Sequence, residues 1–318
     1  MKQTNSIFLI TNALFIFLFL QVSCNKDNDE PVFASFSISD TIFNQGTQVI
    51  FTDNSKGWPN EYFWEFEGGT PATSTEKNPS TVFAQAGTFN VTLTVIGFSN
   101  SSSVTQKVLS MPTEGIAAYY PFNGNANDES GNGHHGTTSG AILSTTDRFD
   151  QPNSAYEFDG IDDFINTSTT FDFPNRTLSL WINTYDITGS GSTAKVAITQ
   201  DDDALNNGIL RVDFQNNQMT LWAGGIAGKY VTTSITPNTW THLVLIREGA
   251  TTKYYVDNVL EYSSVSDGNG STLNPVPDFI IGSGRMTQDQ FFNGKIDDIR
   301  VFNRALNEQE IHALYSGN

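Results

Sequence analysis

Acidic side chains are the residues of this sequence with the clearest capacity for chemistry. Glu157, Asp159 and Asp162 have a spacing that would place carboxylates along one strand, and two carboxyl groups about 5 Å apart hydrolyse glycosidic bonds with retention of configuration. Gly160, however, predicts a hairpin turn inside this segment, which would move Asp162 out of line. We therefore predict no catalytic residue, with a glycoside hydrolase as the alternative.

The loop 123–136 is rich in Asn, Asp and Gly. Side-chain oxygens and conformationally free glycines are what a calcium loop needs. The ligand spacing and terminal Glu of an EF-hand are missing, and the alternative is that these residues only form turns. His134 and His135 in the same loop are interpreted as an exposed pair rather than a transition-metal site.

Two tryptophans are candidate platforms for a sugar ring. In the alternating segment 177–183, Leu178, Leu180 and Ile182 share one face, so Trp181 lies on the other. Trp222 raises the same question near a glycine pair. An aromatic face on an open sheet can stack on a sugar, and the alternative is that both side chains only fill space.

The stretch 294–315 reads as a strand that carries the acid pair Asp297 and Asp298, followed by a short helix. Asn307 is predicted to cap this helix, Glu310 completes a capping box, and Leu306 with Ile311 forms a hydrophobic staple. The mature chain has no other helical signal as clear as this one.

The rest of the chain is a series of short alternating segments separated by turns, which predicts an all-β protein. Residues 31–112 have about seven such segments, as in an immunoglobulin-like sandwich. Residues 113–318 have about a dozen, as in a two-sheet jelly roll with a short C-terminal helix.

The formal net charge of the 318-residue chain is −18, with 16 Lys and Arg against 34 Asp and Glu. A surface of this charge repels nucleic acid and anionic headgroups. It suits a secreted protein that faces solutes, and its carboxylates could bind hard cations such as calcium.

Cys24 is the single cysteine, so no intrachain disulfide can form. Residues 1–23 combine a basic start, an apolar run over 7–20 and a small residue before Cys24, which predicts a signal peptide. Together with Cys24 they resemble a bacterial lipoprotein signal, which implies a lipid on Cys24. Residues 24–30 form an acidic tether that resembles an export signal of surface lipoproteins. We expect an outer-membrane lipoprotein exposed on the cell surface.

Residues 31–112 resemble a PKD domain, a resemblance carried by the segments 64–69, 78–80 and 86–95. The acidic turn that commonly follows the aromatic strand in that family is replaced here by Glu67-Gly68-Gly69. The resemblance implies an immunoglobulin-like sandwich that serves as a spacer or interaction module.

Residues 117–315 resemble the LamG-like domains of the concanavalin A-like lectin/glucanase superfamily, through the segments 120–133, 158–163, 240–242 and 294–298. The resemblance implies a structural calcium ion near the Asn-rich loop and the late acid pair, with Asn123, Asp128 and Asp297 as ligands. It also implies that the first and last strands of the domain lie together, that Asp297 approaches the loop, and that the helix latches over an end.

These features predict a surface-anchored lipoprotein that binds carbohydrate or a protein partner through its LamG-like domain. The PKD-like domain would be the spacer, and the lipid would be the only contact with the membrane. The alternatives are a carbohydrate-active enzyme of the same fold and a structural adhesin without a small ligand.

Overall fold

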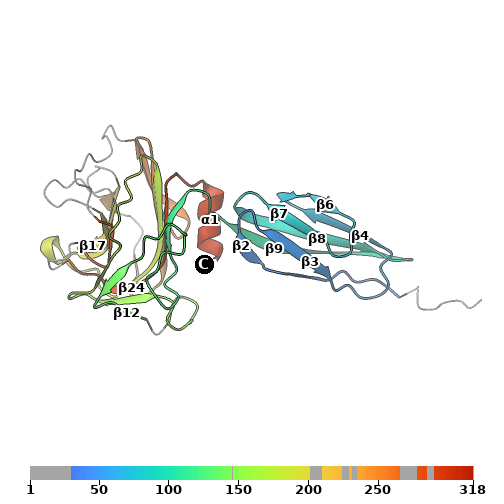
Figure 1. The fold of residues 1–318 in the computed structure, drawn as a ribbon, viewed down its shortest axis with the longest axis horizontal. Helices are drawn as coiled ribbons and strands as arrows, with labels where there is room; N and C mark the ends of the chain where they lie inside the picture. Colours follow the sequence, from blue (N-terminus) through green and yellow to red (C-terminus); the bar gives the residue numbers. More distant parts are fainter. Residues whose placement is uncertain are drawn as a thin grey trace, which may run out of the picture.

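The computed structural model describes residues 30–144, 146–200, 210–223, 229–230, 235–265, 278–284 and 290–317. The predicted signal peptide, the lipid on Cys24 and nearly all of the tether lie outside these residues. The described chain forms two β-sandwiches in line, with helix α1 (Glu308–Gly317) between them (Figure 1). The all-β prediction is confirmed. No helix in the described ranges is long and apolar enough to span a membrane.

The first sandwich packs a four-stranded sheet, β1-β3-β7-β5, on a five-stranded sheet, β2-β9-β8-β4-β6. Trp64 is fully buried between them and stacks on Phe66, and its Nε1 donates to the Glu76 carbonyl at 2.9 Å. The strands are β1 (Phe36–Ile38), β2 (Ile42–Asn44), β3 (Gln48–Asp53), β4 (Glu61–Phe66), β5 (Gly69–Thr70), β6 (Thr73–Ser74), β7 (Ser80–Phe83), β8 (Gly87–Ile96) and β9 (Ser101–Met111).

The second sandwich contains an eight-stranded and a seven-stranded sheet. The eight-stranded sheet has the order β12-β13-β24-β15-β20-β21-β22, with β10 also paired to β24, and the other sheet has the order β11-β14-β23-β16-β17-β18-β19. The elements are β10 (Ile116–Tyr120), β11 (Thr137–Ser139), β12 (Ile142–Leu143), β13 (Tyr156–Asp159), β14 (Phe164–Asn166), β15 (Arg176–Thr184), the 3-10 turn η2 (Gly191–Thr193), β16 (Lys195–Gln200), β17 (Leu210–Gln215), β18 (Gln218–Ala223), β19 (Lys229–Tyr230), β20 (Thr241–Glu248), β21 (Thr251–Val256), β22 (Val259–Val265), β23 (Ile280–Ile281) and β24 (Asn293–Phe302).

Strand alternation divides the side chains of the second sandwich between a common core and two outer faces. In β15, Leu178, Leu180 and Ile182 belong to the core between the sheets, as their spacing predicts. The pairing of the first and last strands is also confirmed, since Tyr119 of β10 lies opposite Arg300 of β24.

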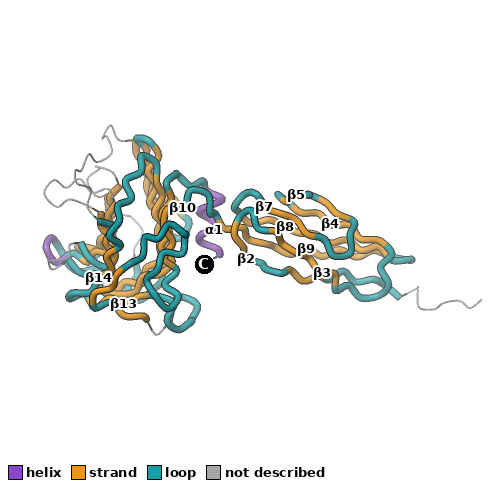
Figure 2. Tube along the Cα trace, in the orientation of Figure 1, coloured by secondary structure: helices purple, strands orange, loops and turns teal. Residues whose placement is uncertain are grey.

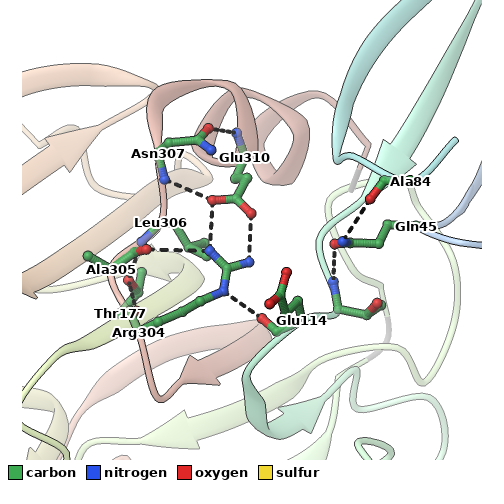
Figure 3. Close-up of polar contacts among 10 residues, drawn as sticks. Gln45, Ala84, Glu114, Thr177, Arg304, Ala305, Leu306, Asn307 and Glu310 are labelled. Atoms are coloured by element: carbon green, nitrogen blue, oxygen red, sulfur yellow. Dashed lines mark hydrogen bonds and ion pairs between the residues drawn. The ribbon is translucent and has the colours of Figure 1, made fainter. Parts of the chain in front are cut away.

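Helix α1 begins with the predicted capping box. The Glu310 N–H donates to Asn307 Oδ1 at 3.0 Å, and the Asn307 N–H donates to Glu310 Oε2 at 2.9 Å. Arg304 donates to both oxygens of Glu310, at 2.9 and 2.6 Å (Figure 3). This ion pair fixes the strand-to-helix turn because a bidentate guanidinium contact defines orientation as well as distance.

The helix packs against both domains and not only over one end of the second. Its buried face, which includes Ile311 and Leu314, joins Val244 of β20 and two β9 residues, Leu109 and Met111, in one apolar cluster. The helix therefore fills the junction between the sandwiches, as Figure 2 shows in purple.

Polar contacts fix the linker between the domains from both sides. Thr113 donates its N–H to the Gln45 side chain of the first domain at 3.2 Å. The next carbonyl, of Glu114, accepts from Arg304 Nε of the second domain at 2.8 Å (Figure 3). The linker is thus held to both sandwiches at adjacent residues.

Candidate functional site

A β-bulge in β24 places the acid pair on one face of its sheet. Trp181 of β15 lies opposite Asp297 and Ser179 lies opposite Arg300, so β24 has one extra residue in this interval. Asp298 has a φ of 53°, a left-handed conformation that suits a bulge. Adjacent residues of a regular strand face opposite sides, whereas here both carboxylates meet one guanidinium.

That guanidinium belongs to Arg148. Its Nη1 pairs with Asp297 and its Nη2 with Asp298 at 2.5 Å, and all three side chains are nearly inaccessible to solvent. Arg300 adds a second cation 3.3 Å from Asp298, with its guanidinium carbon 4.1 Å from the centre of the Tyr119 ring. The acid pair is thus neutralised from within the chain.

The two acids differ in protonation. Burial, followed by the adjacent charge of Asp298, raises the pKa of Asp297 to about 8. Burial also acts on Asp298, but Arg300 and Arg148 hold the pKa of that carboxyl below its ordinary value. Asp298 is therefore the permanent anion of the pair.

The predicted calcium ligands do not form one coordination set in the described chain. Asp128 Oδ1 accepts the N–H groups of Tyr119 and Ser130, each at 2.9 Å, and Oδ2 accepts that of His134 at 3.0 Å. Burial opposes the charge of Asp128, but these hydrogen bonds, led by Ser130, lower its pKa. Asp128 therefore holds the loop 123–136 against β10.

Asn123 and Asp297 line one cavity of about 190 Å³, together with Asp147 and Arg148. Asp128 is not among the residues that line it. A calcium ion at Asp297 would have to compete with Arg148, so this donor set fits calcium poorly.

A group that fits a cation better lies at the turn after β13. One oxygen each of Asp159, Asp162 and Asp163 lie within 4.8 Å of one another. Burial raises the pKa of Asp163, and the charges of Asp159 and Asp162 raise it further, although the Asp159 N–H donates to it. Gly140 leaves room for the Asp163 carboxylate, since a Cβ there would overlap it. Gly160 forms the predicted turn, with a φ of 78°.

Trp181 is placed under α1. Its side chain is 8% exposed, and its ring stacks on Tyr315 of the helix with a centroid distance of 5.8 Å. Arg148 lies 4.9 Å from its ring and His242 packs beside it. Burial, followed by Arg300 and Arg148, lowers the pKa of His242 to about 3. This placement favours the space-filling role of Trp181 over a sugar platform.

The outer face of the seven-stranded sheet carries a second polar cluster, which the sequence reasoning missed. Arg211 Nε donates to Asp213 Oδ2 at 2.8 Å, and both side chains are buried. The register places Thr199 beside Arg211 and Thr220 beside Asp213. These four residues are named the Arg211 cluster below. Alternation is a signal that would have found Arg211 and Asp213, because they interleave with core residues of β17.

The Arg211 cluster is not fully satisfied by the described chain. Within the described ranges, the buried hydroxyls of Thr199 and Thr220 have no hydrogen-bond partner. Gln290 reaches over the cluster and accepts from Arg211 Nη2 at 3.0 Å. Trp222 lies opposite Arg211 in the β17–β18 register, and its side chain falls outside the described part.

The chain matches two family models. Residues 28–110 match the PKD domain, and residues 159–312 match the concanavalin A-like lectin/glucanases superfamily. A search of curated proteins finds no match to this chain.

Solved structures that are similar to this chain include domain 4 of AbnA, an extracellular arabinanase from Geobacillus stearothermophilus, in complex with arabinotriose. It is 19% identical with a TM-score of 0.49, over 63% of this chain and 98% of that domain. The binding domain of botulinum neurotoxin serotype D is 16% identical with a TM-score of 0.49, over 64% of this chain and 51% of the other. A sialidase mutant of Trypanosoma rangeli is 12% identical with a TM-score of 0.48, over 89% and 52%.

This chain thus spans about half the length of the toxin and sialidase chains. The two family models follow each other in the order of the two sandwiches, and the resemblances to a PKD domain and to the concanavalin A-like lectin/glucanase superfamily are thereby confirmed. The chain contains a PKD domain followed by a domain of the concanavalin A-like lectin/glucanases superfamily.

Proposed function

We propose that the concanavalin A-like domain binds a neutral carbohydrate at the Arg211 cluster. The observation that carries this proposal is the pair of buried hydroxyls, of Thr199 and Thr220, that have no partner in the described chain. A buried polar group without a partner costs about 1–3 kcal/mol. Sugar hydroxyls both donate and accept hydrogen bonds, as threonine hydroxyls do, so a sugar can supply the missing partners.

The ion pair of the cluster supports the same role. Arg211 and Asp213 hold each other in one geometry, and this ion pair fixes the polar surface beside the two threonine hydroxyls. The Gln290 amide, which also donates to the Gly191 carbonyl at 2.9 Å, is the described group that a ligand would displace. The formal charge of −18 favours neutral over acidic glycans.

The two outer faces of the sandwich are not equivalent. On the eight-stranded sheet, α1 covers apolar residues and Arg148 seals the acid pair. Both sheets contain buried polar atoms without a partner in the described chain, but Trp181 Nε1 of the eight-stranded sheet lies under Tyr315 of α1. On the seven-stranded sheet, the unsatisfied hydroxyls of Thr199 and Thr220 lie beside the Arg211–Asp213 pair, and for this reason we assign the binding face to it.

Replacement of Thr199 or Thr220 by valine tests this assignment. Each variant is expected to bind oligosaccharide roughly tenfold more weakly, because one hydrogen bond to the ligand is lost, and to gain about 1 kcal/mol in unfolding free energy. Binding of the full mature chain is measured on an array of neutral and acidic glycans, and positive oligosaccharides are then titrated by calorimetry.

Tyr254→Phe is the matched control, because its buried hydroxyl also lacks a partner in the described chain but lies in the eight-stranded sheet. It should gain stability and keep wild-type affinity. Absence of glycan binding by the wild-type chain, or equal affinity of the threonine variants, contradicts the proposal. The remaining interpretation is then that the domain binds a protein partner. We propose binding without hydrolysis, so the bound oligosaccharides should release no new reducing ends.

We also propose that the domain binds a calcium ion through Asp159, Asp162 and Asp163. In chelator at pH 7, Asp163→Asn should be more stable than the wild type by on the order of 1 kcal/mol, since it removes a charge that its neighbours oppose. Added calcium should stabilise the wild type alone and remove this difference. The measurement is the melting temperature of both chains, and a wild type unaffected by calcium contradicts the proposal.

Anchoring at the cell surface by a lipid on Cys24 is the last part of the proposal. It is supported by the apolar run before the single cysteine and by the acidic segment after it. The intact mass of the mature chain reports this lipid directly.

A further inference from the structure

The end of the PKD domain that lies away from α1 carries a group of exposed apolar side chains. Phe98 is 76% exposed, Trp58 62%, Phe33 61% and Ile96 40%. These four residues are named the tip below. Single exposed apolar side chains are common on soluble proteins, so their shared location is what requires an explanation.

Backbone contacts join the segments that carry the tip. Phe33 and Lys56 exchange two hydrogen bonds of 3.0 Å, and the Asn60 N–H donates to the Ile96 carbonyl at 2.8 Å. The Asn100 side chain accepts from the Val32 N–H at 3.0 Å and donates to the Val32 carbonyl at 3.1 Å. These contacts hold the four residues of the tip on segments that are joined to one another around the first described residues of the chain.

The opposite end of the domain is the one that contacts α1. Strands β8 and β9 run antiparallel from Ile96 and Ser101 at the tip to Gly87 and Met111 at the junction (Figures 1 and 2). Ten residues of β8 span about 33 Å. The tip is thus separated from the concanavalin A-like domain by the full length of the PKD domain.

We propose that the tip is a membrane-contacting surface that inserts its aromatic side chains into the headgroup region of a zwitterionic bilayer. This inference rests on the proposed lipid at Cys24 for its geometry. From Cys24 to Glu30 the chain can extend at most about 21 Å, so a lipid on Cys24 holds the tip close to the bilayer and the other domain far from it.

The side chains of the tip suit this location. Trp and other aromatic rings are favoured at the membrane–water boundary, and the apolar area that exposed side chains bury in the headgroup region adds to the affinity of a lipid anchor. Among the charged residues of the segments that carry the tip, the acids Glu30 and Glu61 outnumber the single cation Lys56, which disfavours anionic lipid and points to zwitterionic headgroups. The contact would orient the rod of the two domains outward from the bilayer.

Fluorescence quenching tests the contact in the lipidated protein. The full mature chain is reconstituted in phosphatidylcholine vesicles with lipids brominated near the headgroups. Lipids near the tip should quench part of the tryptophan emission, and this quenching should disappear in Trp58→Phe. Of the other four tryptophans, Trp64 is buried, and Trp181, Trp222 and Trp240 belong to the second domain, which lies far from the tip. Equal quenching in the wild type and in Trp58→Phe overturns the proposal.

Vesicle binding of the Cys24→Ser chain tests the tip in a protein that carries no lipid anchor. A chain that also carries Phe33→Ser, Trp58→Ser and Phe98→Ser should partition into phosphatidylcholine vesicles at least roughly tenfold more weakly. The matched control carries Val259→Ser, Leu260→Ser and Val265→Ser, three exposed apolar residues of β22, and should partition as the parent does. Melting temperatures verify that all chains fold.

Equal partitioning of the two triple variants overturns the inference. A tip variant that loses binding to cells but not to vesicles also overturns it, and indicates a protein partner. A failure of the tip inference can be distinguished from a failure of the proposed function. Glycan binding is measured on the same variants, and the mass of the mature chain reports the lipid. If Cys24 carries no lipid but vesicle binding still depends on the tip, the proposed anchor is refuted and the proposed membrane contact of the tip is supported.

Discussion

Replacement of Arg148 by methionine is expected to lower the free energy of unfolding by roughly 3–5 kcal/mol. The guanidinium contacts Asp297 and compensates the charge of Asp298 in a site that solvent hardly reaches, and removing one partner of a buried pair leaves an uncompensated charge. The measurement is urea unfolding of the full chain at pH 7. Lys253→Met is the control, because Lys253 pairs with Glu248 at 3.9 Å on the exposed surface, and its loss should stay within about 0.5 kcal/mol.

Substituting each acid in turn distinguishes the contributions of Asp297 and Asp298, the two partners of Arg148, to stability. The folded pKa of Asp297 is raised to about 8, so its proton stabilises the fold fully below about pH 4, and this contribution is lost as the pH rises to 8. Asp297→Asn should therefore gain in stability relative to the wild type over that interval.

The pKa of Asp298 is lowered, so its charge stabilises the fold above its ordinary pKa, and this contribution is lost as the pH falls through the folded value. Asp298→Asn should be the more damaging substitution at pH 7. Equal losses for Arg148→Met and Lys253→Met, or the same pH profile for both Asn variants, would contradict the assignment.

Replacement of Leu314 by alanine is expected to cost about 2–5 kcal/mol and to loosen both domains. Leu314 is fully buried in the cluster that joins α1 to β9 and to the eight-stranded sheet, and truncation of a core leucine costs this much in general. Alanine has the highest helix propensity, so the loss reports packing and not the helix itself. Urea unfolding measures the loss.

Hydrogen exchange locates the effect. Amide protection should fall in β9 of the PKD domain as well as in β20, because the helix contacts both. Leu260→Ala, at an exposed position of β22, should change neither stability nor protection appreciably. Unchanged protection in β9 would mean that α1 belongs to the second domain alone.

Local patterns predicted the elements of this protein well. The capping box of Asn307 and Glu310 forms as its spacing requires, because both partners are three residues apart on one turn. The core face of β15 also follows directly from alternation. Such features depend on neighbours in the sequence, and their geometry is fixed by the backbone of one element.

The acid-pair site and the surroundings of Trp181 depend on contacts between residues far apart in the sequence, which local residue spacing does not predict. Arg148 meets the acid pair across about 150 residues of chain, and a bulge at Asp298 decides that both carboxylates face it. Alternation predicts that Trp181 lies on the outer face of β15, as observed, but it does not predict what covers that face. The helix covers it, and it does so from a position between two domains.

The sequence by itself therefore determined the two domains, their order, their all-β class and the capped C-terminal helix, since short-range periodicity and turn chemistry specify these. Only the tertiary structure decided which polar residues meet. It paired Asp297 with Arg148, used Asp128 to hold a loop, and brought Thr199 and Thr220 beside Arg211 and Asp213. The physical reason is that register, bulges and packing partners set which side chains share a surface, and these are properties of several strands together.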